Sequence, residues 1–285
     1  MSANRREIVG GALALAAAGA PAIASNLVPS RIVSLNSCLD AMLVHLADRG
    51  QIAALSHYAR EEHGSTVAAQ ARTLPFTWES AEEVIALRPD LVLASQHSAL
   101  ATRNALKRLD VPVQRFKVPK SVDESLAQVR KLAKLIGHPD RGEALVGRIQ
   151  AAIAAATPAP GARRLSALIY QPNGFAAGPG TLVDEMMDRA GFDNVARRFG
   201  LKTWGNVPLE RLLADPPQVL LVGAPAPGAR SWADRVMTHP ALKTIAGRMR
   251  QVRVPEKLLY CGGPVLIETA AAMAKARAQA LKEGA

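Results

Sequence analysis

The chain contains one stretch twice, and this duplication constrains its fold more than any other sequence feature. The copies are residues 76–94 and residues 204–222. Each reads as an aromatic residue, five residues, a glutamate, an apolar helical turn, an alanine, a proline and an apolar run. The turn predicts a short helix that the proline ends, and the apolar run predicts a buried strand of the parallel type. Two similar segments that lie far apart in the sequence indicate that the chain folds into two similar lobes.

The glutamates of the two copies, Glu82 and Glu210, fall at or near the start of the predicted helices. The ordinary explanation is structural, because a carboxylate there complements the helix dipole and can cap a backbone amide. Because the stretch is duplicated, we also expect the two glutamates to occupy equivalent places on the two lobes.

The rest of the chain predicts an α/β protein. Strands and helices alternate through the first half, which is typical of a parallel sheet flanked by helices. Arg141–Thr157 is an uninterrupted helical pattern that could cross about 25 Å. We expect it to link an N-terminal lobe, residues 25–140, to a C-terminal lobe, residues 158–285, that restarts with its own strand. The fold class is therefore two lobes, each a mainly parallel sheet flanked by helices, joined by one long helix.

Three local signals in the second half are specific enough to check. Asn173-Gly174 predicts a turn, because both residues tolerate positive φ. The segment Phe175–Gly180 reads as a glycine-rich loop, with Thr181 as the cap of the helix that follows. Ser231–Ala246 reads as mostly helical.

The first residues read as an export signal. Arg5-Arg6 precedes an apolar run that is too short to span a bilayer, and Ala22-Ile23-Ala24 has the small-x-small pattern of a cleavage site. We therefore expect residues 1–24 to be a signal peptide, with an uncleaved anchor as the alternative. The paired arginines leave the twin-arginine route open, although other residues typical of that signal are missing.

The charge of the chain argues against a nucleic-acid platform. The formal net charge is +11, but the basic residues are scattered and few aromatic residues lie between them. Nucleic-acid platforms usually interleave aromatic residues with a basic face. A solvated basic surface is favoured, and an acidic ligand is compatible with it.

Two cysteines, Cys38 and Cys261, fall in opposite predicted lobes. An exported protein lives where disulfides persist, and a bridge between these residues would clamp the lobes together. The sequence does not supply the distance that decides the matter. We favour two unpaired thiols.

The sequence contains no recognisable catalytic set. It has no GxSxG, HExxH or GxGxxG motif, and no general base is indicated by spacing for Cys38. His57 and His63 flank two glutamates, but two histidines in a loop are more often solvated than metal-bound. We therefore expect no catalytic residue, metal site or resident cofactor.

The positions of several aromatic residues indicate a ligand-binding site more clearly than the histidines and cysteines do. Tyr58, Tyr170 and Tyr260 each follow an apolar run, and Trp78 and Trp204 precede the repeated helices. In open α/β sheets ligands bind beyond the carboxyl ends of the strands. These side chains are candidates to line a cleft for a bulky ligand, with plugging of the lobe edges as an equal alternative.

The sequence resembles the class III substrate-binding proteins of bacterial ABC importers, which bind iron–siderophores, vitamin B12 and heme. The resemblance covers nearly everything after residue 30 and is specific to the class but not to a ligand. It rests on four segments: Arg31–Leu35, Glu82–Leu93, Gly180–Gly191 and Trp204–Leu213. It implies two lobes joined by one long helix, with the ligand between them.

The resemblance also implies a membrane partner. In such proteins one glutamate per lobe pairs with arginines of the permease dimer in the inner membrane, and Glu82 and Glu210 match those positions. Arginine–carboxylate pairs set orientation and register well. The implied protein is periplasmic and monomeric, and it binds a small molecule and no nucleic acid.

The resemblance leaves the ligand open. In the B12 binders an aromatic residue lies six residues before each docking glutamate, and Phe76 and Trp204 hold those places. Heme binders of the class use tyrosine or histidine as iron ligand. The residues expected to contact the ligand are Cys38, His57, Tyr58, Phe76, Trp78, His97, Tyr170, Trp204 and Tyr260.

We favour an iron–siderophore or similar metal chelate, with a corrinoid or heme as alternatives. A bare metal ion is disfavoured, because the second lobe lacks a matching set of histidine and carboxylate ligands. The alternative from another class is a periplasmic α/β enzyme, which would need an acid–base pair in the cleft.

Overall fold

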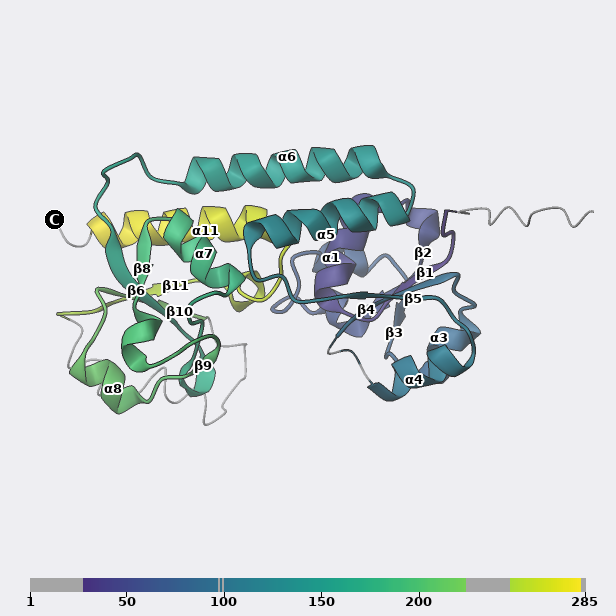
Figure 1. Ribbon diagram of the computed structural model, residues 1–285, viewed down its shortest axis with the longest axis horizontal. Helices are drawn as coiled ribbons and strands as arrows, with labels where there is room; N and C mark the ends of the chain where they lie inside the picture. The colour runs from purple at the N-terminus through teal and green to yellow at the C-terminus, as the bar shows by residue number, and fades with distance from the viewer. Residues whose placement is uncertain (1–27, 97, 99, 224–246, 283–285) are drawn as a thin grey trace, which may run out of the picture.

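Two lobes lie side by side beneath a roof of long helices (Figure 1). The computed structural model describes residues 28–96, 98, 100–223 and 247–282. The expected signal peptide, His97 and the helix expected at Ser231–Ala246 therefore lie outside the described residues.

The N-terminal lobe is built on a fully parallel sheet in the order β3-β2-β1-β4-β5. Its strands are β1 (Ile32–Ser34), β2 (Ile52–Ser56), β3 (Phe76–Thr77), β4 (Leu91–Ser95) and β5 (Val113–Phe116). Its helices are α1 (Ser37–Leu46), α2 (Ala68–Ala71), α3 (Ala81–Ala86), α4 (Leu100–Arg108) and α5 (Val122–Leu135). Successive strand residues point to opposite faces. Ile32 accordingly packs into one apolar cluster and Val33 into another.

The C-terminal lobe has a mixed sheet in the order β11-β10-β6-β7-β9, with β8 also paired to β6. Its strands are β6 (Leu165–Tyr170), β7 (Phe175–Ala176), β8 (Phe192–Asn194), β9 (Gly205–Asn206), β10 (Val219–Val222) and β11 (Arg250–Arg253). Its helices are α7 (Leu182–Arg189), α8 (Leu209–Ala214) and α11 (Val265–Lys282). The pairs β6–β8, β6–β10 and β10–β11 are parallel, whereas β7 is antiparallel to β6 and β9.

One local prediction in this lobe is wrong and two are confirmed. The segment expected to be only a loop begins with β7, whose two residues are too short for periodicity to reveal a strand. Asn173 and Gly174 form the expected turn, with φ of 61° and 72°. Thr181 caps α7 by accepting a hydrogen bond from the Asp184 amide.

The roof is α6 (Pro139–Ala156), which packs on both α5 and α11 (Figure 1). Its buried face presents Leu145, Val146, Ile149 and Ile153 at helical spacing. The helix begins two residues before the predicted start, because a proline is well suited to the first helical turn. The predicted fold class is confirmed: two α/β lobes are joined by one long helix.

Both copies of the duplicated stretch fold as predicted, but their helix starts differ. Ser80 caps α3 by accepting from the Glu83 amide, whereas α8 follows Pro208 and has no side-chain cap. Glu83 also accepts hydrogen bonds from Thr77 Oγ1 and the Trp78 amide, both at 2.7 Å. Ser80 thus caps the helix and the Glu83 carboxylate holds the turn before it, so neither task falls to Glu82.

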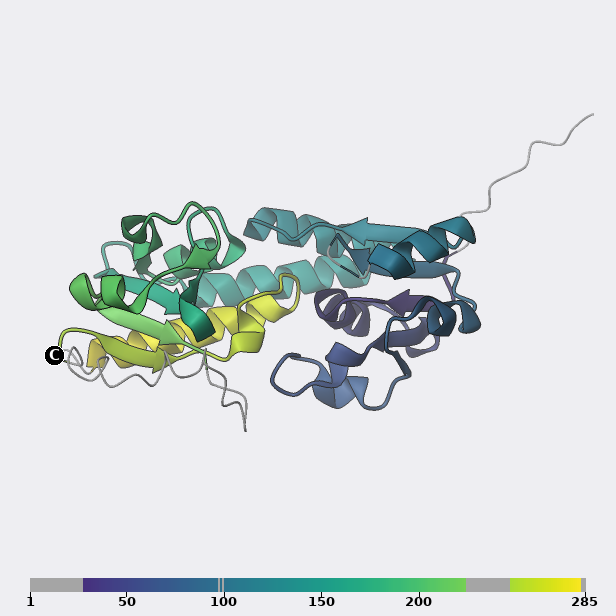
Figure 2. The same ribbon diagram turned by 90° about the horizontal axis from the view of Figure 1, so that it is seen from below.

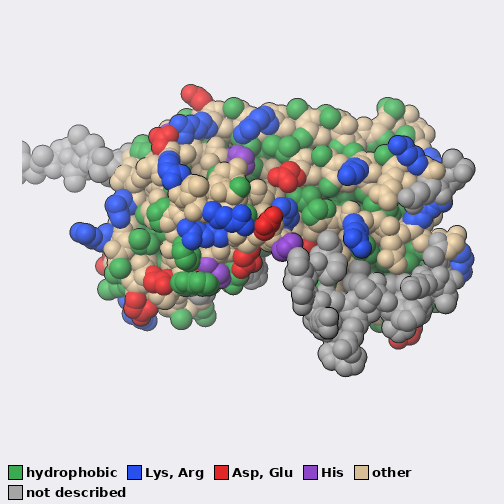
Figure 3. Space-filling view, turned by 180° about the vertical axis from the view of Figure 1, so that it is seen from behind, with side chains coloured by type: hydrophobic (Ala, Val, Ile, Leu, Met, Phe, Trp, Pro, Cys, Tyr) green, Lys and Arg blue, Asp and Glu red, His purple; other side chains and the backbone are tan. Residues whose placement is uncertain are grey.

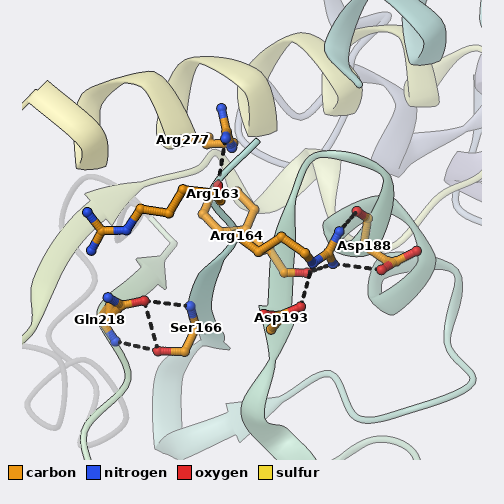
Figure 4. Close-up of polar contacts among 8 residues, drawn as sticks. Arg163, Arg164, Ser166, Asp188, Asp193, Gln218 and Arg277 are labelled. Carbon is orange, nitrogen blue, oxygen red and sulfur yellow. Dashed lines mark hydrogen bonds and ion pairs between the residues drawn. The ribbon is translucent and has the colours of Figure 1, made fainter. Parts of the chain in front are cut away.

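Arg164 ties three segments together at the amino-terminal end of β6 (Figure 4). Its guanidinium donates to Asp193 Oδ1 at 2.6 Å, to Asp188 Oδ1 at 2.7 Å and to the Phe192 carbonyl at 2.7 Å. One side chain thus holds α7 and β8 against the start of β6. This network is far from the carboxyl ends of the strands, so its role is structural.

We expect Arg164→Ala to lower the free energy of unfolding by about 1–2 kcal/mol, because two carboxylates and a carbonyl lose a shared charged donor. Arg198→Ala is the matched control, since it removes a single exposed ion pair to Asp215 in the same lobe. Chemical denaturation measures both variants. Equal small losses would show that the Arg164 network contributes no more than one surface pair.

Candidate functional site

A cavity of about 110 Å³ lies between the lobes. Parallel strands present their carboxyl ends at one edge of a sheet, and Asn36, Ser95 and Phe116 at these ends line the cavity on the N-terminal side. Tyr260 and Gly262 line it from the C-terminal lobe. This is the edge at which open α/β sheets bind ligands.

A second cavity of about 280 Å³ adjoins the first, since Val118, Pro119 and Tyr260 line both. Its N-terminal wall includes Lys120, and its C-terminal wall includes Trp204. The two cavities form one cleft between the lobes, with Tyr260 at its centre.

The N-terminal lobe carries an aromatic cluster at the carboxyl ends of β2 and β3. The His57 ring lies 3.8 Å from the Tyr58 ring and 4.6 Å from the Trp78 ring, and Phe76 packs edge-on to Trp78 at 5.8 Å. Trp78 is 65% exposed. The guanidinium of Arg60 lies 4.0 Å over the Phe76 ring. The structure therefore brings together four residues that the sequence proposed as ligand contacts.

The backbone around Trp78 is fixed although its side chain is exposed. Its amide donates to Glu83, and Thr102 Oγ1 donates to the Glu79 carbonyl at 2.8 Å. Glu79 adopts a φ of 71°, which is unusual for a residue with a side chain. Such local strain persists only where the surroundings hold it. The indole is thus presented on a rigid turn.

The C-terminal lobe carries a second aromatic cluster. Phe175 stacks on Trp204 at 5.1 Å with an interplanar angle of 10°, and Trp204 lies 6.0 Å from Tyr260. Phe175 was not among the residues proposed from the sequence. Its position directly after the Asn-Gly turn, at the end of a strand–turn unit, is the signal that could have revealed it.

Tyr260 is held by polar partners. Its hydroxyl donates to the side chain of Gln171 and lies 3.0 Å from Glu256 Oε1. Burial, followed by the charge of Glu256, raises the pKa of the Tyr260 hydroxyl. This tyrosine is thus kept neutral, which favours packing and hydrogen bonding over coordination of iron as a phenolate.

Tyr170 lies in the core of the C-terminal lobe instead of the cleft. It is 0% exposed, and its hydroxyl donates to the Val207 carbonyl at 3.1 Å. Burial raises the pKa of Tyr170 to about 12, so the group stays a neutral donor. The apolar run that precedes it does end at the cleft side, but the ring points into the lobe's own core cluster.

Cys38 and Cys261 form a disulfide, with their Cα atoms 5.2 Å apart. The expectation of two unpaired thiols is therefore wrong. A fold that places the start of α1 against the turn before α11 brings together residues separated by 223 positions, which no local pattern reveals.

Glu82 and Glu210 are exposed and occupy equivalent positions, each the second residue of its helix. Their helices, α3 and α8, lie on the side of the lobes away from α6 (Figure 1). Within the described part of the chain, neither carboxylate makes a hydrogen bond or ion pair. Both are available to an external partner on one side of the molecule.

Comparison with known proteins agrees with this architecture. Residues 32–256 match the family described as Periplasmic binding protein. The chain belongs to this family. A heme-binding member from Roseiflexus sp. RS-1 superposes with a TM-score of 0.69 at 26% identity, covering 87% of this chain and 98% of that one. The vitamin B12-binding protein BtuF of Vibrio cholerae shares the fold, with a TM-score of 0.64 at 17% identity over 90% and 99% of the two chains.

A curated relative from Halobacterium salinarum is called cobalamin-binding protein. It is 25% identical over 72% of this periplasmic binding protein and 57% of its own length. The chain thus spans just over half of that relative. Among the described residues, no helix is long and apolar enough to cross a membrane. The same residues contain no group of three or more histidine, cysteine or carboxylate side chains placed to hold a metal ion.

Two acids near the cleft edge of this periplasmic binding protein were missed by sequence analysis. Asp40 is fully buried on α1 and accepts hydrogen bonds from the Ser56 amide and hydroxyl. Burial raises the pKa of Asp40 to about 7. Hydrogen bonds from Ser34 and Ser56 lower the pKa in part, and the charge of Glu79 raises it by a smaller amount. Burial also raises the pKa of Glu79 to about 7. Asp40 is closed off from any ligand, so it joins α1 to β2 and offers no acid–base group to the cleft.

The raised pKa of Asp40 predicts a pH-dependent loss of stability. The folded state keeps the proton that the unfolded chain releases above about pH 4, so this group makes stability fall as pH rises from about 4 to about 7. We expect Asp40→Asn to remove that part of the slope, because an amide does not ionise. Its oxygen can accept from the Ser56 amide, and its NH2 group can donate to the Ser56 hydroxyl. Thermal unfolding across this range measures it.

Asp110→Asn is the control, because Asp110 is exposed and its φ of 53° suits asparagine. It makes the same change of charge and should leave the slope as in the wild type. Parallel curves for the wild type and Asp40→Asn would contradict the assignment.

Proposed function

We infer that this periplasmic binding protein captures a metal chelate of tetrapyrrole size between its lobes and delivers it to the permease of an ABC importer. The observations that carry this proposal are the two aromatic clusters, one on each lobe, and the cleft between the lobes, which Trp204 and Tyr260 of the C-terminal cluster line. Flat aromatic side chains provide large apolar contact at low cost in conformational entropy.

A corrinoid is the first candidate ligand. The positions six residues before Glu82 and Glu210 are aromatic, and in the structure Phe76 belongs to one cluster and Trp204 to the other. The curated relative that matches 72% of the chain is named for cobalamin binding. This reverses the order favoured by the sequence, in which an iron–siderophore came first.

Heme is the second candidate, and the N-terminal cluster favours it. Tyr58 is 46% exposed and His57 lies against it, so this lobe offers the two residue types that coordinate heme iron. Tyr260 is a poorer iron ligand because Gln171 and Glu256 hold its hydroxyl.

Glu82 and Glu210 are the proposed contacts to the permease. They are exposed, equivalent in the two lobes and on helices at the same side of the molecule. A pair of carboxylates at a fixed spacing suits two arginines of a symmetric permease dimer. Export from the cytoplasm by residues 1–24, a monomeric state and the lobe boundaries at residues 140 and 158 complete the proposal.

The ligand is tested by adding cyanocobalamin, hemin or a ferric hydroxamate to the purified protein and measuring its thermal stability and visible spectrum. A ligand at about 100 times its dissociation constant should stabilise the fold by about 2.7 kcal/mol. We expect cyanocobalamin to give this shift. Binding of hemin with a spectrum that changes in Tyr58→Phe or His57→Ala would favour the second candidate, and no shift with any of the three would refute the proposal.

Trp204→Ala should weaken the bound chelate about tenfold, since an aromatic contact contributes about 1.5 kcal/mol. Leu109→Ala is the control, because it removes an exposed apolar side chain at the end of α4 that lines neither cleft cavity. Isothermal titration measures both. An unchanged affinity in Trp204→Ala would place the ligand elsewhere.

The permease contacts are tested by uptake in cells. Glu82→Ala and Glu210→Ala should abolish uptake and leave ligand affinity at the wild-type value. Glu143→Ala on α6, which faces away from the docking side, is the control and should transport normally. A loss of affinity in the first two variants would instead assign these carboxylates to the ligand.

A further inference from the structure

A groove on the N-terminal lobe lies between α4 and β5, apart from the cleft. It encloses about 500 Å³, and none of the described residues that line it also lines a cleft cavity. Val113 of β5 lines the groove and packs against the apolar cluster that contains Leu106 of α4 and Val84 of α3. Seen from below, α4 lies beside β5 (Figure 2). The groove therefore lies on the side of the lobe away from α6, where α3 carries Glu82. We call it the α4–β5 groove.

Three cationic side chains line the α4–β5 groove. Arg103 and Lys107 are four residues apart and so share one face of α4, while Arg115 lines the groove from β5. Asp110 is the one acid among the described residues of its wall. No ion pair joins any of the three cations to another described residue. Like charges four residues apart destabilise a helix, so a bound anion would relieve the repulsion.

The guanidinium of Arg103 is already held in place. Its Nη1 donates to the Gln96 carbonyl at 2.9 Å and to the Ser95 carbonyl at 3.2 Å, at the end of β4. Its Nη2 makes no hydrogen bond to the described residues. A guanidinium anchored in this way is a pre-organised donor to the oxygens of a phosphate or a carboxylate.

Charges on other parts of the surface are mixed. On the face seen from behind, Lys and Arg side chains lie among Asp and Glu side chains (Figure 3). On the roof, Arg130 pairs with Glu143 at 2.8 Å, and Arg141 pairs with Asp48 at 2.7 Å. The α4–β5 groove is therefore a local excess of positive charge, beyond the basic character of the whole chain.

Two exposed leucines flank the cationic residues of α4. Leu100, the first residue of the helix, is 63% exposed and also lines the groove, and Leu109, directly after the helix, is 57% exposed. Apolar side chains beside lysine and arginine are typical of surfaces that lie on a lipid headgroup layer. A small soluble anion would use the cations alone. The combination of leucines and cations therefore favours a lipid.

We propose that the α4–β5 groove binds the headgroup of an anionic phospholipid and so holds this side of the N-terminal lobe on the membrane surface. Arg103 donates to the phosphate, Lys107 and Arg115 neutralise its charge, and the two leucines contact the apolar boundary below the headgroups. Each cation near an anionic membrane contributes about a fivefold gain in binding. The docking proposed for Glu82 would turn the same side toward the permease, but lipid binding itself needs neither the permease nor the ligand of the cleft.

Vesicle binding tests this proposal in the ligand-free protein, so the outcome does not depend on the function proposed above. The protein is used without residues 1–24, since an apolar leader would itself bind lipid. Binding is measured by flotation with vesicles of phosphatidylcholine alone and of phosphatidylcholine with phosphatidylglycerol in equal parts. We expect binding to the mixed vesicles only, and a loss of that binding as salt is raised.

The groove variant Lys107→Gln/Arg115→Gln should weaken binding to the mixed vesicles about 30-fold, because two cations are lost. Both side chains are exposed, so the fold should be retained. Lys134→Gln/Arg148→Gln is the matched control, because it removes the same charge from exposed residues of α5 and α6, and it should bind as the wild type does. Wild-type binding by the groove variant, equal losses in both double variants, or no binding to the mixed vesicles would overturn the proposal.

Asp110→Asn tests the same groove by a gain of binding. It removes the acid of the groove, and asparagine suits the φ of 53° at this position. Binding to the mixed vesicles should strengthen about fivefold. Asp123→Asn, which changes an exposed acid of α5, is the control and should leave binding unchanged. An unchanged affinity in Asp110→Asn, or the same gain in both variants, would contradict the proposal.

Two further measurements identify other occupants of the groove. Inorganic phosphate that raises the thermal stability of the wild type but not of the groove variant, in a protein that does not bind vesicles, would assign the groove to a soluble anion. A groove variant that binds vesicles normally but loses binding to the permease in phosphatidylcholine nanodiscs would assign the groove to an acidic segment of the permease. Either result would overturn the membrane contact.

Discussion

The packing of one face of α6 against both α5 and α11 is the interaction on which the rest of the structure depends. Its buried residues join a single apolar cluster that contains Ile32 and Leu43 of the N-terminal lobe as well as Leu266 and Ala270 of α11. Full burial of each large aliphatic side chain stabilises by roughly 1.5–3 kcal/mol. The lobes are therefore joined by a shared core at the roof, and their lower parts are left to form a cleft.

Strand direction then decides what the cleft contains. All strands of the N-terminal sheet are parallel, so their carboxyl ends and the residues that follow them face the same gap. This places Cys38 after β1, His57 after β2 and Trp78 after β3 at one edge. The C-terminal lobe supplies Trp204 from the segment before β9 and Tyr260 from the turn before α11. Residues far apart in the chain become neighbours because of sheet topology.

Sequence patterns predicted most of this architecture and part of the site. The duplicated stretch was recognisable because an amphipathic turn, a proline and an apolar run each have a local physical cause. Aromatic residues could be proposed as ligand contacts because they follow apolar runs or precede the repeated helices. Patterns could not separate Tyr58, which is exposed, from Tyr170, which is buried, since both follow an apolar run. That difference depends on whether another segment, here the one containing Val207, covers the ring.

Features that depend on how closely remote segments approach in space could not be predicted from the sequence. The disulfide requires α1 and the turn before α11 to approach closely, and only the packing of the roof brings them together. The raised pKa of Asp40 is also a consequence of burial, because nothing around Asp40 in the sequence distinguishes it from an ordinary acid in the first turn of a helix. β7 and β9 escaped notice because each has two residues and is stabilised by the neighbouring strand.

The first turn of α3 connects the two surfaces that the proposed function requires. Glu83 holds the backbone of Trp78 with its carboxylate, while Glu82, one residue earlier, makes no hydrogen bond or ion pair with the described residues and is exposed. The amide of Glu83 is in turn held by Ser80. Because this turn is already rigid, little conformational entropy would be lost when the Trp78 ring contacts a ligand. The turn also keeps the backbone of Glu82 at a fixed place on the lobe, so that in the proposed function one short helix would serve both the ligand and the permease.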